Sequence, residues 1–419
     1  MRRRQPLATP GWLALAVALV PLWVAAGATS ASASAPAPAV RPLNAPARSA
    51  APASAVEPAA RLSFRLLDPP DDVPHHGVWD RIAFGGQAEA RFAHDRVAGV
   101  GNPDWASVQR VSGFAVARVH DRLWLLGEVA YDRATDDLVV ERALVDLRLR
   151  ETVALHGGVL PLPLGRANLE RDAPRGEFTD RSLVATALIG VPSSQLGVGV
   201  RGLLRRASFV SYELDAVTGY DDGLIDDSPD GTRVPRGRNG WADNNGIPAL
   251  AGRIALHPGP GAELGLGALA GPYNRTDLDG VTVDRSRALI LAVADGATAV
   301  AGVRLAGEAA LVTVDVPPGL QPLFAEQQWG ASLEAARTLR QPLIGAWARS
   351  SLGAALRADA VDFDRAIPGD SKSRLSASAN VRPGPSAVLR FGWYYELRRD
   401  RFDNPVPAAG LVLSAASYF

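Results

Sequence analysis

Polar and apolar residues alternate along most of the chain after residue 80. The pattern is clearest in the segments 81–94 and 386–399, where one parity is mostly apolar and the other mostly polar. Successive side chains of a β-strand point to opposite faces, so each segment predicts a strand with one apolar and one polar face. At about ten to fourteen residues, these strands are longer than those of soluble sheets and match strands that cross a bilayer at a tilt.

Similar runs recur and bring the expected total to about sixteen strands, an even number as in bacterial single-chain barrels. The connections between them alternate in length: short ones such as 120–121 and 150–151 are separated by longer ones such as 161–193 and 219–247. This alternation is typical of strands that run up and down a barrel. We therefore predict an all-β fold, a transmembrane antiparallel up-and-down β-barrel over residues 81–419.

The first 80 residues lack this pattern. Residues 1–35 combine the basic Arg2–Arg4, an apolar run from Trp12 to Val24, and small residues suited to cleavage, which is typical of a signal peptide. Residues 36–80 are rich in alanine and proline and hold too few bulky side chains for a core, so we predict a periplasmic lead-in. The predicted location is the bacterial outer membrane, reached by export through the periplasm.

The composition excludes several classes of function. There is no cysteine, and 44 basic residues balance 44 acidic ones, which argues against disulfides, thiolate metal sites and nucleic acid as a partner. No common catalytic motif is present. A hydrolase assembled across strands from His94, His120 or His156 has no local spacing to support it. We predict no enzyme activity.

No cofactor or metal is predicted either. The adjacent pair His75-His76 would point to opposite faces of a strand, with no third ligand nearby. The run from Asp226 to Gly231 resembles the start of a calcium loop. Its twelfth position is Gly237, which cannot supply the carboxylate that such a loop requires.

The stretch 157–182 is the least strand-like part of the predicted barrel. It combines three prolines with many charges, so it reads as a long loop. We predict that this loop folds inward and narrows the pore. Its expected constriction residues are Arg166, Arg171, Arg175, Asp180 and Arg181. Arg181 has an alternative role, in which it pairs with a wall carboxylate and fixes the loop.

The polar parity of each strand predicts the side chains that face the lumen. The expected pore-lining residues are Arg91, Arg142, Arg148, Arg201, Arg253, Arg304, Arg349, Arg357, Arg390, Arg398, Glu89, Asp146, Glu308 and Glu396. Arg374, Glu213, Asp215, Glu334 and Asp359 share this parity. Charged rings in a pore select by sign, and this mixture favours a mild preference for anions. Alternatively, many of these arginines are wall residues that pair with acids on neighbouring strands.

One motif resembles a known family. Gly158, Pro161, Pro163, Gly165 and Asn168, followed by the run Phe178 to Ser182, are similar to the stretch that precedes the constriction loop in the phosphate-selective porin family, of the porin O and porin P type. The resemblance implies a 16-stranded outer-membrane porin, a homotrimer, that passes small anions. Leu164 replaces the family's Phe, Asp180 replaces its Glu, and the family's lysine cluster has no counterpart. The resemblance therefore does not extend to phosphate selectivity.

These observations predict a porin: a water-filled channel for passive diffusion of small hydrophilic solutes, with a mild preference for anions such as phosphate or carboxylates. Expected partners are outer-membrane lipid, lipopolysaccharide, small anionic or polar solutes, and the barrel-assembly machinery, which would recognise the aromatic end at Phe419. The main alternative is a non-conducting structural or adhesive barrel. A soluble propeller would need a repeat of about 40 residues, which the sequence lacks.

Overall fold

The computed structural model describes residues 81–419 apart from 103–104, 134–135, 206–207, 226–229 and 239–240. The predicted signal peptide and lead-in, the His75-His76 pair and the first residues of the calcium-like run lie outside this part of the chain. Within it, no helix is long and apolar enough to span a membrane.

Sixteen long strands form the wall in the described residues, and a seventeenth, β2, is a two-residue segment that pairs with the end of β1. The strands are β1 (Ile82–Val97), β2 (Val100–Gly101), β3 (Ala106–His120), β4 (Leu123–Asp132), β5 (Asp137–Arg150), β6 (Val153–Pro161), β7 (Ser194–Arg205), β8 (Phe209–Val217), β9 (Ala249–Gly259), β10 (Ala262–Pro272), β13 (Ala288–Val300), β14 (Val303–Val314), β15 (Gln327–Arg340), β16 (Ser351–Asp362), β17 (Ser371–Gly384), β18 (Ala387–Arg399) and β19 (Pro405–Tyr418). A small separate hairpin joins β11 (Asp277–Leu278) to β12 (Val281–Thr282).

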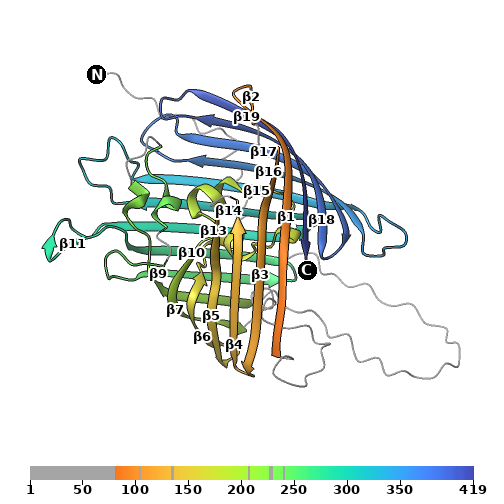
Figure 1. Ribbon diagram of the computed structural model, residues 1–419, viewed down its shortest axis with the longest axis horizontal. Coiled ribbons are helices and arrows are strands. Elements are labelled where there is room, and N and C mark those ends of the chain that lie inside the picture. Colours follow the sequence, from red (N-terminus) through yellow and green to blue (C-terminus); the bar gives the residue numbers. More distant parts are fainter. Residues whose placement is uncertain (1–80, 103–104, 134–135, 206–207, 226–229, 239–240) are drawn as a thin grey trace. The chain divides into compact units, whose positions relative to one another are not determined.

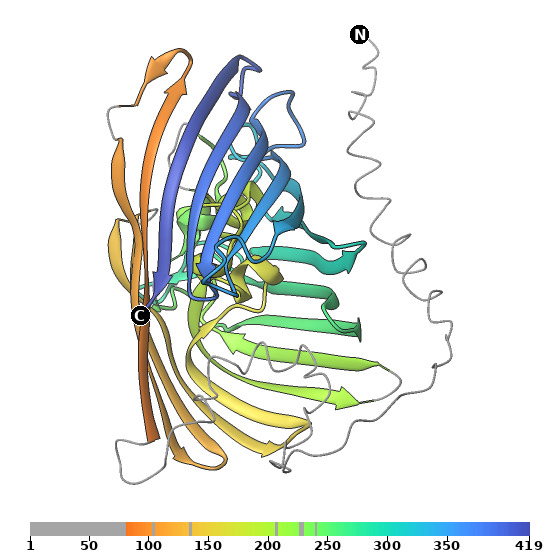
Figure 2. The ribbon, with the colours of Figure 1, turned by 90° about the vertical axis from the view of Figure 1, so that its right-hand side faces the viewer.

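The sheet closes on itself. Each wall strand pairs antiparallel with the next one along the chain, and β1 also pairs with β19 from Gln87↔Tyr418 to Val97↔Ala408. Figures 1 and 2 show these two strands, in orange and dark blue, side by side. Beyond β19, Phe419 and Gly86 exchange two backbone hydrogen bonds of 3.0 Å. The predicted closed antiparallel barrel of sixteen strands is confirmed.

Alternation along each strand separates an outer from an inner face. In β18, Leu389, Phe391, Trp393 and Tyr395 are exposed on the outside, whereas Arg390 is buried on the inside. Many other wall strands likewise expose leucine, valine or isoleucine outward. An exposed apolar band of this extent would be unfavourable in water.

The connections differ at the two ends of the barrel, as predicted. At one end, here called the short-turn end, strands are joined by turns such as 121–122, 151–152 and 301–302. The other, the long-loop end, carries 162–193 and 218–248. The connection 341–350 is an exception, because it is long yet lies at the short-turn end.

This exception corrects one predicted pore residue. Because β16 begins only at Ser351, Arg349 lies in a connection and not on the inner wall. The side chain of Ser350 holds the preceding residues in a compact loop: its Oγ accepts from the Ile344 amide at 2.8 Å and donates to the Trp347 carbonyl at 2.6 Å. An isolated bridge between Ile344 and Trp347 strengthens that loop.

Candidate functional site

The loop 162–193, here called the inner loop, lies inside the barrel (Figures 1 and 2, yellow). It contains three short helical segments: α3 (Gly165–Leu169), η2 (Ala173–Arg175) and η3 (Ala185–Ile189). α3 contacts β10 and β13, η3 contacts β14 and β15, and η2 contacts β1, β18 and β19. The inner loop therefore packs against much of the wall from within.

Asn168 closes the base of the inner loop. Its buried amide nitrogen donates to the carbonyls of Leu162, at 2.7 Å, and Ser193, at 2.8 Å, while its oxygen accepts from the Ser193 amide at 2.9 Å. One side chain thus joins the two ends of the loop and satisfies backbone groups that are buried away from water.

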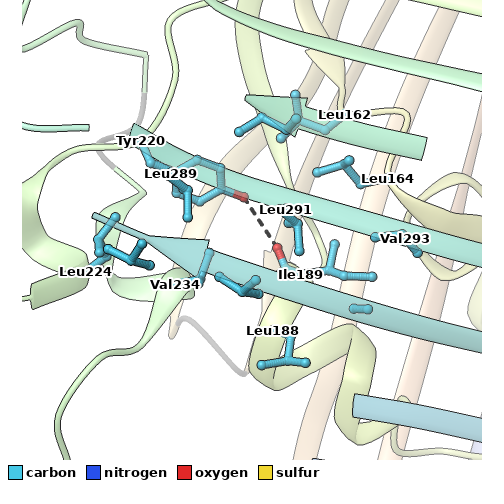
Figure 3. Close-up of a cluster of buried hydrophobic side chains, with 14 of the residues drawn as sticks. Leu162, Leu164, Leu188, Ile189, Tyr220, Leu224, Val234, Leu289, Leu291 and Val293 are labelled. Atoms are coloured by element: carbon cyan, nitrogen blue, oxygen red, sulfur yellow. Dashed lines mark hydrogen bonds between the residues drawn. The ribbon is translucent and has the colours of Figure 1, made fainter. Parts of the chain in front are cut away.

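An apolar cluster fixes one side of the inner loop (Figure 3). Leu188 and Ile189 of η3 are fully buried with Leu289 and Leu291, which lie on the inner face of β13. The connection 218–248 covers the cluster with η4 (Asp222–Ile225) and η5 (Val234–Gly237). Burial of each such side chain stabilises the fold by about 1.5–3 kcal/mol.

Tyr220 joins this cluster to a polar contact. Its hydroxyl lies 3.2 Å from the Ser193 hydroxyl and 3.4 Å from the Ile189 carbonyl, the contact drawn in Figure 3. Burial raises the pKa of Tyr220, so the phenol keeps its proton and remains a donor.

Wall arginines hold the other side of the inner loop. Arg357 donates to the carbonyls of Asp180 and Arg181, at 2.9 and 3.2 Å. Arg382 and Arg390 both donate to the Gly176 carbonyl, at 3.0 and 3.1 Å. A guanidinium carries several donors in a fixed plane, which suits it to binding several carbonyls at once.

Two of these arginines are also paired with buried carboxylates. Arg390 lies 2.9 Å from Glu89 of β1, and Arg357 lies 3.0 Å from Asp359 and over the ring of Phe178 at 4.5 Å. Both arginines have the predicted inward parity, but the inner loop covers them. Their charges therefore interact with groups of the protein and not with solute in the lumen.

A β-bulge creates a contact that the alternating pattern does not reveal. Glu128 of β4 pairs with Arg142 and Val129 with Val140, so Glu141 is an extra residue in β5. Its carboxylate turns inward and binds Arg110 at 2.6 Å and Arg171 of the inner loop at 3.4 Å. Burial lowers the pKa of Arg171 to about 10, against the opposing effect of Glu141, so Arg171 stays charged at neutral pH.

The remaining predicted loop residues differ in exposure. Arg166 of α3 lies 2.6 Å from Glu170, the residue that follows α3. The half-exposed Arg175 lies 3.8 Å from Asp172. Asp180 faces Arg91 of the wall at 3.7 Å.

Arg181 donates to the Val191 carbonyl of its own loop at 3.1 Å. The wall residue that binds the backbone at this position is Arg357.

Most of the other predicted wall residues face a partner on the inner side. Arg142 lies 3.3 Å from Glu128, Arg253 lies 2.7 Å from Glu263 and 2.5 Å from Asp295, and Glu308 accepts from the Ala167 amide at 3.3 Å. Further pairs are Arg148 and Arg201 with Asp146, Arg304 with Glu177, and Arg374 and Arg398 with Glu396.

No protein-family model and no curated sequence match the chain. The fold is similar to that of OmpF from Salmonella typhi in complex with daunomycin, with a TM-score of 0.53 and 13% identity over 81% of this chain and 97% of that one.

It is also similar to the anion-selective porin from Comamonas acidovorans, with a TM-score of 0.51 and 11% identity over 81% and 99% of the two chains. The outer membrane channel DcaP of Acinetobacter baumannii gives a TM-score of 0.50 and 11% identity over 81% and 97%. The chain has the fold of an outer-membrane porin. At sequence identities of 11–13%, the similarity establishes the fold alone.

Proposed function

We propose that the protein is an outer-membrane porin, a channel for passive diffusion of small hydrophilic solutes with a mild preference for anions such as phosphate or carboxylates. The closed wall supports this proposal, because a barrel satisfies all backbone groups between strands and can reside in lipid. The outward apolar side chains of strands such as β18 would contact the lipid tails.

One observation carries the anion preference. In several inner ion pairs the arginine is exposed and the carboxylate is not: the side chains are 48% and 12% exposed for Arg304 and Glu177, and 43% and 0% for Arg398 and Glu396. Arg175 and Asp172 follow the same order, with 50% and 12%. At these three pairs, solutes in the lumen would meet more positive than negative charge, whereas Arg91 and Asp180, at 15% and 31%, and Arg166 and Glu170, at 28% and 37%, have the opposite order.

The proposed setting follows from the same features. The barrel would lie in the bacterial outer membrane, in contact with lipid and lipopolysaccharide, as a homotrimer. The barrel-assembly machinery would recognise the strand that ends at Phe419. An anion-selective porin has a similar fold, so this fold is compatible with the proposed selectivity. The sequence resemblance to the phosphate-selective porin family supports phosphate as one solute to test.

Reversal potentials in a planar bilayer test the proposal. Under a KCl gradient, the full chain folded in detergent should give discrete conductance steps and a reversal potential displaced toward that of chloride. Arg304→Glu should reduce or reverse the displacement. The matched control is Arg285→Glu in the connection 273–287. The Arg285 side chain is highly exposed and pairs with Asp315 of another connection, beyond the ends of the wall strands. Equal permeation of both ions through the unaltered protein would contradict the anion preference.

A non-conducting structural or adhesive barrel is the second candidate, and one observation favours it. The apolar cluster fills the inner side of β13 and β14 under the connection 218–248, so part of the lumen is occupied by protein. On this alternative, the folded chain inserts into bilayers but gives no conductance steps.

A further inference from the structure

Three potential metal ligands converge on the inner face of neighbouring strands. In the strand register, His156 of β6 lies opposite Gly199 of β7, and Gly199 lies opposite Asp215 of β8. Glu213 precedes Asp215 by two positions and therefore shares its face. The lack of a side chain at Gly199 lets the histidine reach across β7, since a Cβ there would lie 1.9 Å from Asp215 Oδ1 and 2.7 Å from His156 Nε2.

The distances are close to those of a metal site. His156 Nε2 lies 2.7 Å from Asp215 Oδ1 and 3.8 Å from Glu213 Oε1, and one ligand atom from each residue lies within 4.8 Å of the others. Ligands around a tetrahedral zinc ion, at about 2.0–2.2 Å from the metal, are about 3.3 Å apart. Small side-chain movements would therefore bring all three atoms to bonding distance.

Arginines and carboxylates surround this cluster on the inner face. Nearby carboxylates have arginine partners: Asp146 pairs with Arg201, and Asp295 with Arg253. Glu213 lies opposite Arg201 of β7 and Arg253 of β9 in the strand register, so the arginines that pair with Asp146 and Asp295 also lie near Glu213. Asp215 is fully buried and faces the imidazole of His156, in a place where a charge without a partner is costly.

A buried polar atom without a hydrogen-bond partner independently indicates a missing ligand. The side chain of Asp215 is fully buried, and its Oδ2 has no hydrogen-bond partner among the described residues. Buried polar atoms are nearly always satisfied, so Asp215 Oδ2 lacks the partner that a buried carboxylate oxygen normally has.

We propose that His156, Glu213 and Asp215 bind a divalent transition-metal ion of the Zn²⁺ type on the inner wall. Imidazole nitrogen and carboxylate oxygen are suitable zinc ligands, and three protein ligands leave a fourth position for water. Glu213 is the most exposed of the three, so that position is on the lumen side. The bound ion would offset the two carboxylates, a role that does not depend on whether the barrel conducts.

The test is metal binding to the full chain, produced without a histidine tag and folded in detergent. Titration with Zn²⁺ should show one saturable site per chain by calorimetry. Co²⁺ at the same site should give the intense visible absorption of a tetrahedral ion, which Zn²⁺ displaces. The variants His156→Gln and Asp215→Asn should lose both signals.

Two further variants separate this site from weak surface binding. His257→Gln is the matched control, because this inward, buried histidine faces a single carboxylate, Glu263, at 3.8 Å, and it should bind as the unaltered protein does. Gly199→Ala retains every ligand but blocks the approach across β7, and it should lose the site. Absence of saturable binding, or unchanged binding by His156→Gln, would overturn the proposal and leave His156 as a structural partner of Asp215.

Discussion

Two sections of the inner wall hold the same loop by different means. Along β13 and β14 the contact is apolar, with Leu289 and Leu291 packed against η3. Along β16 to β18 it is polar, with Arg357, Arg382 and Arg390 bound to loop carbonyls. Apolar packing is non-directional and supplies stability, whereas donors aimed at particular carbonyls also fix position. Together, apolar packing on one side and directed hydrogen bonds on the other hold the inner loop at a fixed place inside the barrel.

The largest expected effect comes from breaking the polar section at Arg390. Arg390→Ala would leave Glu89 buried without its partner, which costs about 3–5 kcal/mol. Arg398→Ala, on the same face of β18 but 43% exposed, should cost less than about 1 kcal/mol. Urea unfolding in detergent, followed by tryptophan fluorescence, measures both. Equal effects of the two substitutions would show that burial under the inner loop does not distinguish these arginines.

The second prediction breaks the apolar section. Leu188→Ala should lower the free energy of unfolding by about 2–5 kcal/mol, because it removes buried methyl groups and leaves a cavity. Leu356→Ala on the outer face of β16 is the control, since its side chain is 59% exposed and contacts detergent. The same unfolding assay should show a much smaller loss for Leu356→Ala. A loss of similar size in both would mean that the cluster does not stabilise the loop.

The third prediction concerns the base of the loop. Asn168→Ala would leave the Leu162 and Ser193 carbonyls without their donor, at a cost of about 1–3 kcal/mol. Thr186→Ala removes a bond of 3.0 Å to the Ser182 carbonyl near the lumen surface and should cost less. Proteolysis of the folded protein should then cut the inner loop faster in Asn168→Ala. Equal rates for both variants would argue against a closing role for Asn168.

The smallest stability effect is expected at Arg175. Its side chain is half exposed, so Arg175→Gln should change the free energy of unfolding by less than about 1 kcal/mol. If the pore conducts, the same substitution should reduce the preference for chloride, measured as a smaller reversal potential. An unchanged potential would remove Arg175 from the residues that contact solute.

The sequence contained enough to predict the barrel, its strand count and the segment that folds inward. Period-two alternation is strong where one face meets an apolar exterior and the other a polar lumen, as in β1 and β18. It fails in β13, where Leu289 and Leu291 face inward and Ile290 faces outward, because the inner loop supplies an apolar environment on the polar side. Such a strand reads as a continuous apolar run.

The details of the site were less predictable, for two physical reasons. Alternation gives the face of a strand but not what covers it, so Arg390 and Arg398 look alike in sequence although one is buried and the other exposed. A bulge shifts parity, which hid Glu141 and its partner Arg110. A signal for the latter was present, since Glu141 and Arg142 are adjacent and both charged at a break in the pattern of β5.

The pairing of β1 with β19 has a consequence for assembly. Every other pair of wall strands joins neighbours in the chain and can form as a hairpin, whereas this pair joins residues as distant as Gln87 and Tyr418. Contacts between distant residues form late, because the chain entropy they remove is not offset until the intervening parts are in place. Until this pair forms, the unpaired edges of β1 and β19, which lie beside apolar faces, can associate with other chains. The moment of closure, more than the formation of any hairpin, is therefore where correct folding competes with aggregation.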